Sequence, residues 1–333
     1  MMSETPLLSV KDLRVTFAAP SGLLHPVRGV SFDVNSRETL GIIGESGCGK
    51  SVTADALMGL LPARASRVGG EASLNGQPLL SLSLSDEARR RLRGNALAMI
   101  FQDPLSSLNP VYTVGEQIDE SLRQHTTLSR QARKARVHEL LTQVGMPDPA
   151  ACAVSYPHRL SGGMRQRVMI AIAIACGPGL LIADEPTTAL DVTIQAQILS
   201  LLDKLKAETD MGIVLITHDL SVVAQMCQRV IVMYLGEVVE QADVFTLFDN
   251  ARHPYTQALL RAVPNLDAPR KSELPEITGS VPPLSHPPTG CGFAPRCPLA
   301  DERCHQSPPM LSVADGAGHR VRCWKADSLG SAV

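Results

Sequence analysis

The sequence lacks a marked excess of charge of either sign. Its formal net charge is −2, and charged residues make up 19% of the 333 residues. A nucleic-acid-binding protein would be expected to carry a basic surface, and a disordered one a high net charge with low hydrophobicity. The basic run at 89–94 has no aromatic residues between its arginines, so we interpret it as a solvated helix face. The composition therefore does not indicate nucleic acid as a partner.

Long hydrophobic runs are also missing. The most apolar stretch, 168–183, is interrupted by Gly177, Pro178 and Gly179, and each remaining piece is shorter than the roughly 20 residues of a membrane-spanning helix. The N-terminus has no basic region followed by an apolar run, so no secretory signal is expected. The chain by itself is predicted to be soluble and cytoplasmic.

The sequence does contain short apolar runs that alternate with helical patterns. The runs that resemble buried strands lie at 39–44, 96–101, 180–185, 213–217 and 230–234. Alternation of such strands with helices predicts an α/β fold with a mostly parallel core sheet. Segments 8–17 and 236–241 are predicted to form antiparallel strands beside it.

The composition changes along the chain and suggests a division into domains. Residues 7–262 are expected to form the α/β domain, which includes a helical subdomain at about 104–175. A proline-rich stretch at 280–290 is typical of a stiff connector. Residues 263–333 are therefore expected to hold this connector and a cysteine-rich extension.

The stretch GESGCGKS at 44–51 is the strongest chemical motif. It matches GxxxxGKS, follows an apolar strand and precedes a helical run, which is the context of a phosphate loop. Its glycines let backbone amides surround phosphate oxygens, Lys50 bridges the outer phosphates, and Ser51 ligates Mg²⁺. We predict a nucleoside triphosphate site. The predicted contacts are Gly44, Glu45, Ser46, Gly47, Cys48, Gly49, Lys50, Ser51 and Val52.

Two acidic residues, Asp184 and Glu185, end the apolar run LLIADE. We expect Asp184 to hold Mg²⁺ and Glu185 to polarise an attacking water. Two solvated surface carboxylates are the alternative, which fits poorly with the apolar strand before them.

A second glycine-rich motif, LSGGM at 160–164, opens a predicted helix. The backbone amides at Ser161, Gly162 and Gly163 and the positive end of the helix dipole favour a phosphate. One compact chain cannot bring this motif to its own triphosphate, so we expect it to meet ATP bound by another chain. An ordinary helix N-cap is the alternative for Ser161.

These motifs, in this order, resemble the ATP-binding subunits of ABC transporters, in which LSGGQ is the signature and two subunits enclose two ATP molecules. Met164 stands where the signature has Gln. The resemblance implies further roles: a Q-loop contact to Mg²⁺ or water for Gln102, a D-loop for Asp191, a γ-phosphate contact for His218, and adenine stacking for Phe17. A helix N-cap remains an alternative for Asp191, and a core position for Phe17.

The resemblance covers residues 10–324 and is densest with the oligopeptide and dipeptide importers, through stretches such as MIFQDPLSSLNP and HPYTQALL. It implies an ATPase that energises peptide import at the cytoplasmic face of the inner membrane. The implied partners are a second ATPase chain, expected to be a paralogue, two membrane permease subunits and an extracytoplasmic solute-binding protein. Importers of nickel, metallophores or glutathione are alternatives, and a soluble non-transport ABC ATPase is a more distant one.

Half of the eight cysteines lie close to the C-terminus. Cys291, Cys297, Cys304 and Cys323 are separated by five, six and eighteen residues. Four thiolates can bind an iron–sulfur cluster or Zn²⁺, and the absence of a CxxC pair is unlike a usual zinc finger. The tail resembles the extension of the peptide importers, in which such cysteines hold a four-iron cluster. An iron–sulfur cluster is therefore expected, with zinc as the alternative.

Overall fold

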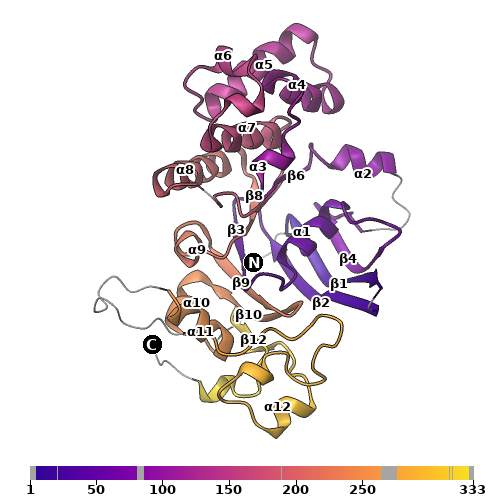
Figure 1. Ribbon diagram of the computed structural model, residues 1–333, viewed down its shortest axis with the longest axis vertical. Helices are drawn as coiled ribbons and strands as arrows, with labels where there is room; N and C mark the ends of the chain where they lie inside the picture. The colour runs from indigo at the N-terminus through magenta and orange to yellow at the C-terminus, as the bar shows by residue number, and fades with distance from the viewer. Residues whose placement is uncertain are drawn as a thin grey trace. The chain divides into compact units, whose positions relative to one another are not determined.

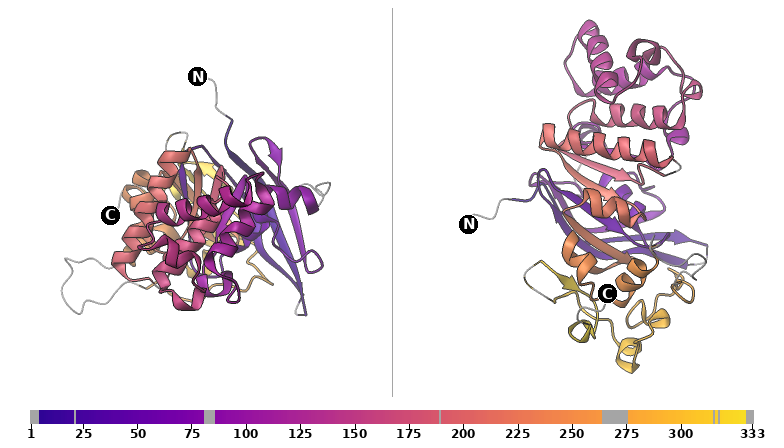
Figure 2. Two further views of the ribbon diagram at one scale, coloured as in Figure 1. Left: turned by 90° about the horizontal axis from the view of Figure 1, so that it is seen from above. Right: turned by 90° about the vertical axis from the view of Figure 1, so that its left-hand side faces the viewer.

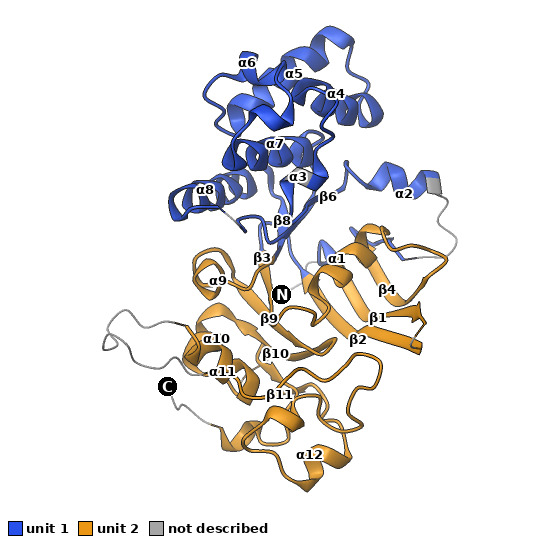
Figure 3. Cartoon of the chain, in the orientation of Figure 1, with its two compact units in different colours: residues 1–8, 34–38, 74–215 blue, residues 9–33, 39–73, 216–333 orange. Residues whose placement is uncertain are grey.

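The structure is a computed structural model in which the chain divides into two compact units (Figure 3). Unit 1 comprises residues 1–8, 34–38 and 74–215, and unit 2 comprises residues 9–33, 39–73 and 216–333. The structure describes residues 5–20, 22–80, 86–188, 190–263, 276–314, 316 and 318–329. Both units draw on distant parts of the sequence, so each fold depends on long-range pairing.

Unit 1 contains a buried group of strands in the order β8-β7-β6. These are β6 (Leu97–Ile100), β7 (Leu180–Asp184) and β8 (Gly212–Ile216), the last ending at the unit boundary. β6 and β7 are parallel, and every residue of the three strands is buried. Continuous apolar runs of this kind are typical of parallel strands covered on both faces.

The remaining elements of unit 1 are mostly helices, and α4 to α7 pack together (Figures 1 and 2). The elements are β5 (Gln77–Pro78), α2 (Asp86–Leu92), α3 (Pro104–Ser107), α4 (Val114–His125), α5 (Arg130–Gln143), α6 (Pro149–Ala153), η1 (Pro157–Arg159), α7 (Gly162–Ile174) and α8 (Val192–Thr209). α4 buries Val114, Ile118 and Leu122, spaced four residues apart along one helix face. Among the described residues, no helix is both long and apolar enough to cross a membrane.

Unit 2 contains two groups of strands (Figure 1). The first has the order β2-β1-β4, from β1 (Leu8–Ala19), β2 (Gly22–Val34) and β4 (Ser66–Leu74). The second has the order β11-β12-β10-β9-β3, from β3 (Thr39–Ile43), β9 (Arg229–Tyr234), β10 (Glu237–Asp243), β11 (Ser312–Val313) and β12 (Arg320–Val321). β3 is parallel to β9, whereas β10 is antiparallel to both β9 and β12.

The predicted α/β alternation is confirmed, since every predicted buried strand lies within about a residue of an observed one. The antiparallel strand predicted at 236–241 is also confirmed, and it is joined to β9 by a turn in which Leu235 and Gly236 have positive φ of 47° and 80°. The helical elements of unit 2 are α1 (Lys50–Met58), α9 (Leu220–Met226), α10 (Val244–Asp249), α11 (Pro254–Arg261), η2 (Ala294–Arg296), α12 (Glu302–Gln306) and η3 (Ala326–Ser328).

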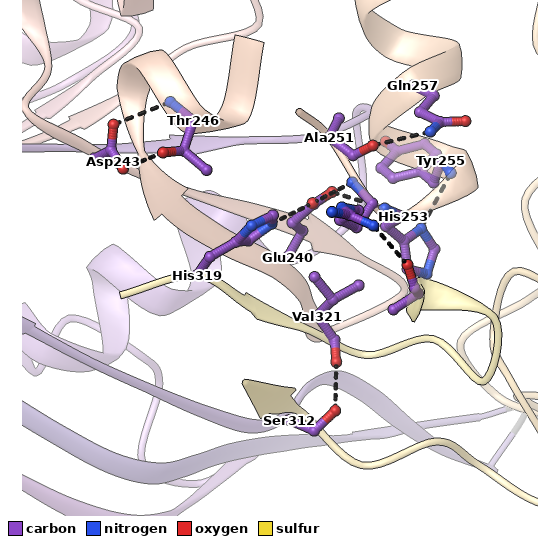
Figure 4. Close-up of polar contacts among 12 residues, drawn as sticks. Glu240, Asp243, Thr246, Ala251, His253, Tyr255, Gln257, Ser312, His319 and Val321 are labelled. Atoms are coloured by element: carbon purple, nitrogen blue, oxygen red, sulfur yellow. Dashed lines mark hydrogen bonds and ion pairs between the residues drawn. The ribbon is translucent and has the colours of Figure 1, made fainter. Parts of the chain in front are cut away.

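A buried carboxylate joins the C-terminal segment, residues 276–329, to the rest of unit 2 (Figure 4). Glu240 is fully buried and accepts hydrogen bonds from the backbone N–H groups of Arg252 and His253, at 2.6 and 3.0 Å. The same carboxylate lies 2.9 Å from Nε2 of His319. Burial lowers the pKa of His253 to about 4, so its ring is neutral and its Nδ1 accepts from the Tyr255 N–H. These contacts hold β12 and the start of α11 against β10.

Substitution Glu240→Ala should destabilise the fold strongly, because it removes the acceptor shared by three buried donors. We expect the free energy of unfolding to fall by about 3 kcal/mol or more. Urea denaturation followed by circular dichroism measures it. Glu302→Ala, in the exposed α12 of the same segment, is the control and should change stability by less than about 0.5 kcal/mol. Equal urea midpoints for the two variants would contradict this role of Glu240.

Candidate functional site

The loop at 44–51 lies between β3 and α1 in unit 2 and is shaped by its glycines. Gly44, Gly47 and Gly49 have positive φ angles of 149°, 82° and 103°. A Cβ on Gly44 would lie 2.2 Å from the Met233 carbonyl oxygen, and one on Gly49 would lie 2.1 Å from that of Pro26. Only glycine combines this backbone with such close approach.

Lys50 is the first residue of α1, and its side chain turns back into the loop. Its Nζ donates to the carbonyl oxygens of Gly44 and Glu45, at 2.7 and 3.1 Å, and lies 3.8 Å from Sγ of Cys48. Burial raises the pKa of the Cys48 thiol, so this sulfur is neutral. Ser46, Gly47 and Ser51 are exposed, and Val52 is half-buried. The loop therefore combines the Lys50 ammonium, which is fixed by hydrogen bonds, with the hydroxyl of the exposed Ser51.

Glu185 follows the last residue of β7 in unit 1 and has a positive φ of 47°. Its Oε2 accepts hydrogen bonds from Nε2 of Gln102, at 3.0 Å, and from Oγ1 of Thr188, at 2.9 Å. Asp184 is buried at the end of the strand. The structure thus brings together Gln102 and Glu185, and adds Thr188, which the sequence motifs did not single out. Strained backbone of this kind is found preferentially at functional positions.

The LSGGM motif faces a cavity of about 510 Å³ in unit 1. Ser161, Gly162, Gly163 and Asp191 line this cavity together with Met164. Both alternative N-cap roles are present, since the side chain of Ser161 caps α7 and that of Asp191 caps α8. A Cβ on Gly163 would lie 2.8 Å from Cγ2 of Ile194, so α7 and α8 approach closely at this point.

The other predicted nucleotide contacts lie in unit 2. Phe17 lies on β1 and is half-buried, so it is not fully enclosed as a core residue would be. His218 follows β8 and is exposed. Two residues that the motifs did not predict, Tyr255 and Arg296, contact Glu45 of the loop. No local sequence signal marks either of them.

The four C-terminal cysteines gather around one small pocket. Cys291, Cys297, Cys304 and Cys323 all line it, and their thiols are free. Burial raises the pKa values of Cys291 and Cys297, and raises that of Cys323 to about 11. Within the described ranges, no group of three or more His, Cys, Asp or Glu residues could hold a metal ion as the side chains stand. The four cysteines therefore line one pocket, and the described residues contain no compact single-ion site.

Two families match the sequence. The family described as "ABC transporter" matches residues 27–188, and the "Oligopeptide/dipeptide transporter, C-terminal region" matches residues 239–304. A Sinorhizobium fredii protein, named as a probable peptide ABC transporter ATP-binding protein, is 51% identical over 97% of this chain and 96% of its own length. The chain belongs to the ATP-binding proteins of ABC transporters.

Another relative and a solved structure are also similar to this chain. A Brucella ovis protein named for peptide import ATP binding is 48% identical over 97% of this chain and 99% of its own. The dimeric ATP-binding cassette MJ0796, solved in a post-hydrolysis state with ADP and Pi, is 28% identical with a TM-score of 0.64. The match covers 71% of this chain and 98% of that cassette. The ABC-type α/β fold with mixed sheets is therefore shown for this chain.

Substitution Gly49→Ala should abolish high-affinity ATP binding by this ABC protein. The added Cβ would overlap the Pro26 carbonyl oxygen, and the φ of 103° is strained for any residue with a side chain. We expect the affinity for MgATP, measured by calorimetry, to fall by at least about tenfold, which corresponds to about 1.4 kcal/mol. Gly22→Ala is the matched control, because Gly22 has a φ of 116° but no atom within 4 Å of the added Cβ. Unchanged affinity in Gly49→Ala would contradict the loop's role.

Proposed function

We propose that this chain is the ATP-hydrolysing subunit of an importer that carries dipeptides or oligopeptides across the cytoplasmic membrane. The observation that carries the proposal is the presence, in one chain, of a sterically constrained phosphate loop and a C-terminal region that matches the oligopeptide and dipeptide transporters. The names of the Sinorhizobium and Brucella relatives support peptides as the solute, and that of the Brucella relative supports import as the direction.

At the nucleotide, we assign phosphate binding to the loop amides and Lys50, and Mg²⁺ binding to Ser51, Asp184 and Gln102. Mg²⁺, when bound, neutralises charge that develops on the phosphate oxygens. The loop fits a phosphate chemically, because its ammonium is held by two carbonyl oxygens that phosphate oxygens can replace. The other assigned contacts are Gly44, Glu45, Ser46, Gly47, Cys48, Gly49, Val52, Phe17 and His218.

Glu185 is assigned as the group that orients and polarises the attacking water. Its carboxylate is held by Gln102 and Thr188, and both hydrogen bonds reach Oε2. An ionised carboxylate only accepts hydrogen bonds, so this group can accept one from the attacking water. Because the two donors fix the rotamer, the carboxylate loses little freedom when the water binds.

The cavity at the LSGGM motif is assigned to the triphosphate held by a second ATPase chain. Ser161, Gly162 and Gly163 lie at the N-terminus of α7, where backbone amides and the helix dipole favour an anion. Asp191 lines the same cavity from α8. The dimeric state of the similar cassette supports a pair of ATPase chains. We propose that the second chain is a paralogue, that two permease subunits and a solute-binding protein complete the importer, and that the pair lies at the cytoplasmic face of the inner membrane.

The C-terminal segment is proposed to bind an iron–sulfur cluster through Cys291, Cys297, Cys304 and Cys323. The donor set fits, since four free thiols line one pocket. Four cysteine thiolates are the usual ligands of a four-iron cluster, and spacing without a CxxC pair is unlike a usual zinc finger, so we propose the iron–sulfur cluster, with zinc as the alternative. We retain the boundary between residues 262 and 263 as a proposed domain division.

Substitution Glu185→Gln should lower the rate of ATP hydrolysis by at least about 100-fold in the purified complex, because an amide cannot accept the proton of water. ATP binding should survive, so that a closed, ATP-bound pair of chains accumulates. Phosphate release and gel filtration with ATP measure the two effects. Glu208→Gln, which changes an exposed carboxylate on α8, is the control. Brisk turnover in Glu185→Gln would overturn the assignment.

The metal and partner assignments are tested by one anaerobic purification in mild detergent. We expect about four iron atoms per chain with matching sulfide, and co-purification of two membrane subunits with a second ATPase. Cys304→Ser should lose the visible absorption of the cluster, whereas Cys176→Ser, in unit 1, should keep it. Zinc in place of iron would contradict the iron–sulfur assignment and favour a zinc site. Absence of the membrane subunits would contradict the assignment to an importer complex.

A further inference from the structure

The phosphate loop is held by residues outside the nucleotide motifs. The guanidinium of Arg296, in η2 of the C-terminal segment, forms two parallel contacts with the Glu45 carboxylate. Nη1 lies 2.6 Å from Oε2, and Nη2 lies 3.0 Å from Oε1. From α11, the hydroxyl oxygen of Tyr255 accepts from the Glu45 N–H at 2.8 Å. Glu45 is therefore fixed through both its side chain and its backbone.

The Arg296 guanidinium is saturated with acceptors. Besides the carboxylate, its N–H groups donate to the Thr278 carbonyl oxygen at 3.0 Å, the Ile277 carbonyl oxygen at 3.1 Å and the Tyr234 hydroxyl at 3.4 Å. All five donors of the planar group are used, and the side chain is only 4% exposed. A lysine has three donors and no planar fork, so it cannot reproduce this set of contacts.

Glu45 in turn makes a direct hydrogen bond with Lys50. Its carbonyl oxygen accepts from Nζ of Lys50 at 3.1 Å and from the Cys48 N–H at 3.2 Å. A shift of Glu45 would therefore move the groups that hold Lys50 and turn the loop. Glu45 thus links Arg296 of the C-terminal segment to Lys50, the residue that we assign to phosphate binding.

A packed aromatic group keeps the two holding residues in place. Tyr234 of β9, Tyr255 of α11 and Phe293 of the C-terminal segment have ring centroids 4.7 to 5.4 Å apart. Tyr255 is fully buried, and burial raises the pKa of its hydroxyl, so the group stays neutral. The rings leave Tyr255 and Arg296 little rotamer freedom.

We infer that Arg296 and Tyr255 are positioning residues for ATP, which hold Glu45 and thereby keep the phosphate loop in its binding conformation. The C-terminal segment then contributes to nucleotide affinity, although neither residue belongs to a nucleotide motif. The inference rests on the proposed ATP site at the loop. A loop ordered before binding loses less conformational freedom when the nucleotide arrives, so affinity is gained without a direct contact.

The test is MgATP binding to the full chain by calorimetry, with Arg296→Met, Glu45→Gln and the double variant. We expect each single variant to weaken binding about tenfold, within the usual range of coupling between linked sites. Since the two side chains act as one unit, the double variant should bind no more weakly than Arg296→Met. In the assembled complex, KM for ATP of Arg296→Met should rise by a similar factor while kcat stays within about twofold, as expected when binding shared by the ground state and the transition state is lost.

A matched control separates positioning from plain loss of stability. Arg322, also in the C-terminal segment, donates to the carbonyl oxygens of Val238 and Pro309, at 2.9 and 3.2 Å, and does not contact the loop. Arg322→Met should leave ATP affinity within about twofold of wild type, in line with additive, independent sites. Equal losses of affinity in Arg322→Met and Arg296→Met would overturn the inference.

Further variants keep the inference falsifiable if Arg296→Met does not fold. Tyr255→Phe removes one hydroxyl, and it should weaken ATP binding about threefold to tenfold, the typical worth of one hydrogen bond. Arg296→Lys keeps the charge and should not restore wild-type affinity. Wild-type affinity in both would overturn the inference.

Lys50→Ala separates a failure of the positioning role from a failure of the proposed ATP site. If Lys50→Ala abolishes binding while Arg296→Met and Tyr255→Phe bind ATP normally, the positioning role alone fails. ATP binding that survives Lys50→Ala would overturn the proposed site and the inference with it.

Discussion

The backbone of the phosphate loop is the constraint on which unit 2 depends. Gly44 and Gly49 approach the carbonyl oxygens of Met233 and Pro26 so closely that no side chain fits. The turn after β9 closes the arrangement, since the Gly236 N–H donates to the Cys48 carbonyl oxygen at 3.0 Å. Segments before β3 and after β9 therefore both determine the shape of the loop. The conformation that binds a phosphate is produced by the whole unit and not by the motif alone.

The C-terminal segment is tied into the same structure at two places. Glu240 gathers donors from α11 and from the loop before β12, and Arg296 reaches Glu45. Arg296 is the last residue of η2 and is directly followed by Cys297, so a proposed metal ligand and the ion pair to the phosphate loop are adjacent in sequence. The proposed cluster is therefore linked to the phosphate loop through the ion pair between Arg296 and Glu45.

Most of the fold followed from local patterns in the sequence. Continuous apolar runs predicted β3, β6, β7, β8 and β9, because the interior of a strand buried on both faces is almost wholly apolar. The N-caps at Ser161 and Asp191 were also foreseeable, since a small polar side chain before a helix has few other partners. The contacts of Glu45 were not, because Tyr255 and Arg296 lie 210 and 251 residues away in sequence. The cysteine spacing indicated a shared site, but distances between thiols depend on the folded backbone and could not be read from spacing.

The central proposal is that ATP hydrolysis by this chain drives peptide import. The most direct test is to reconstitute the co-purified complex in proteoliposomes, with the ATPase chains outside, and to supply labelled peptides with the solute-binding protein inside. We expect peptide to leave the lumen only when MgATP is added outside the vesicles, and we expect Glu185→Gln to stop this transport. Hydrolysis of ATP that proceeds at the same rate with and without peptide, and moves none, would contradict it.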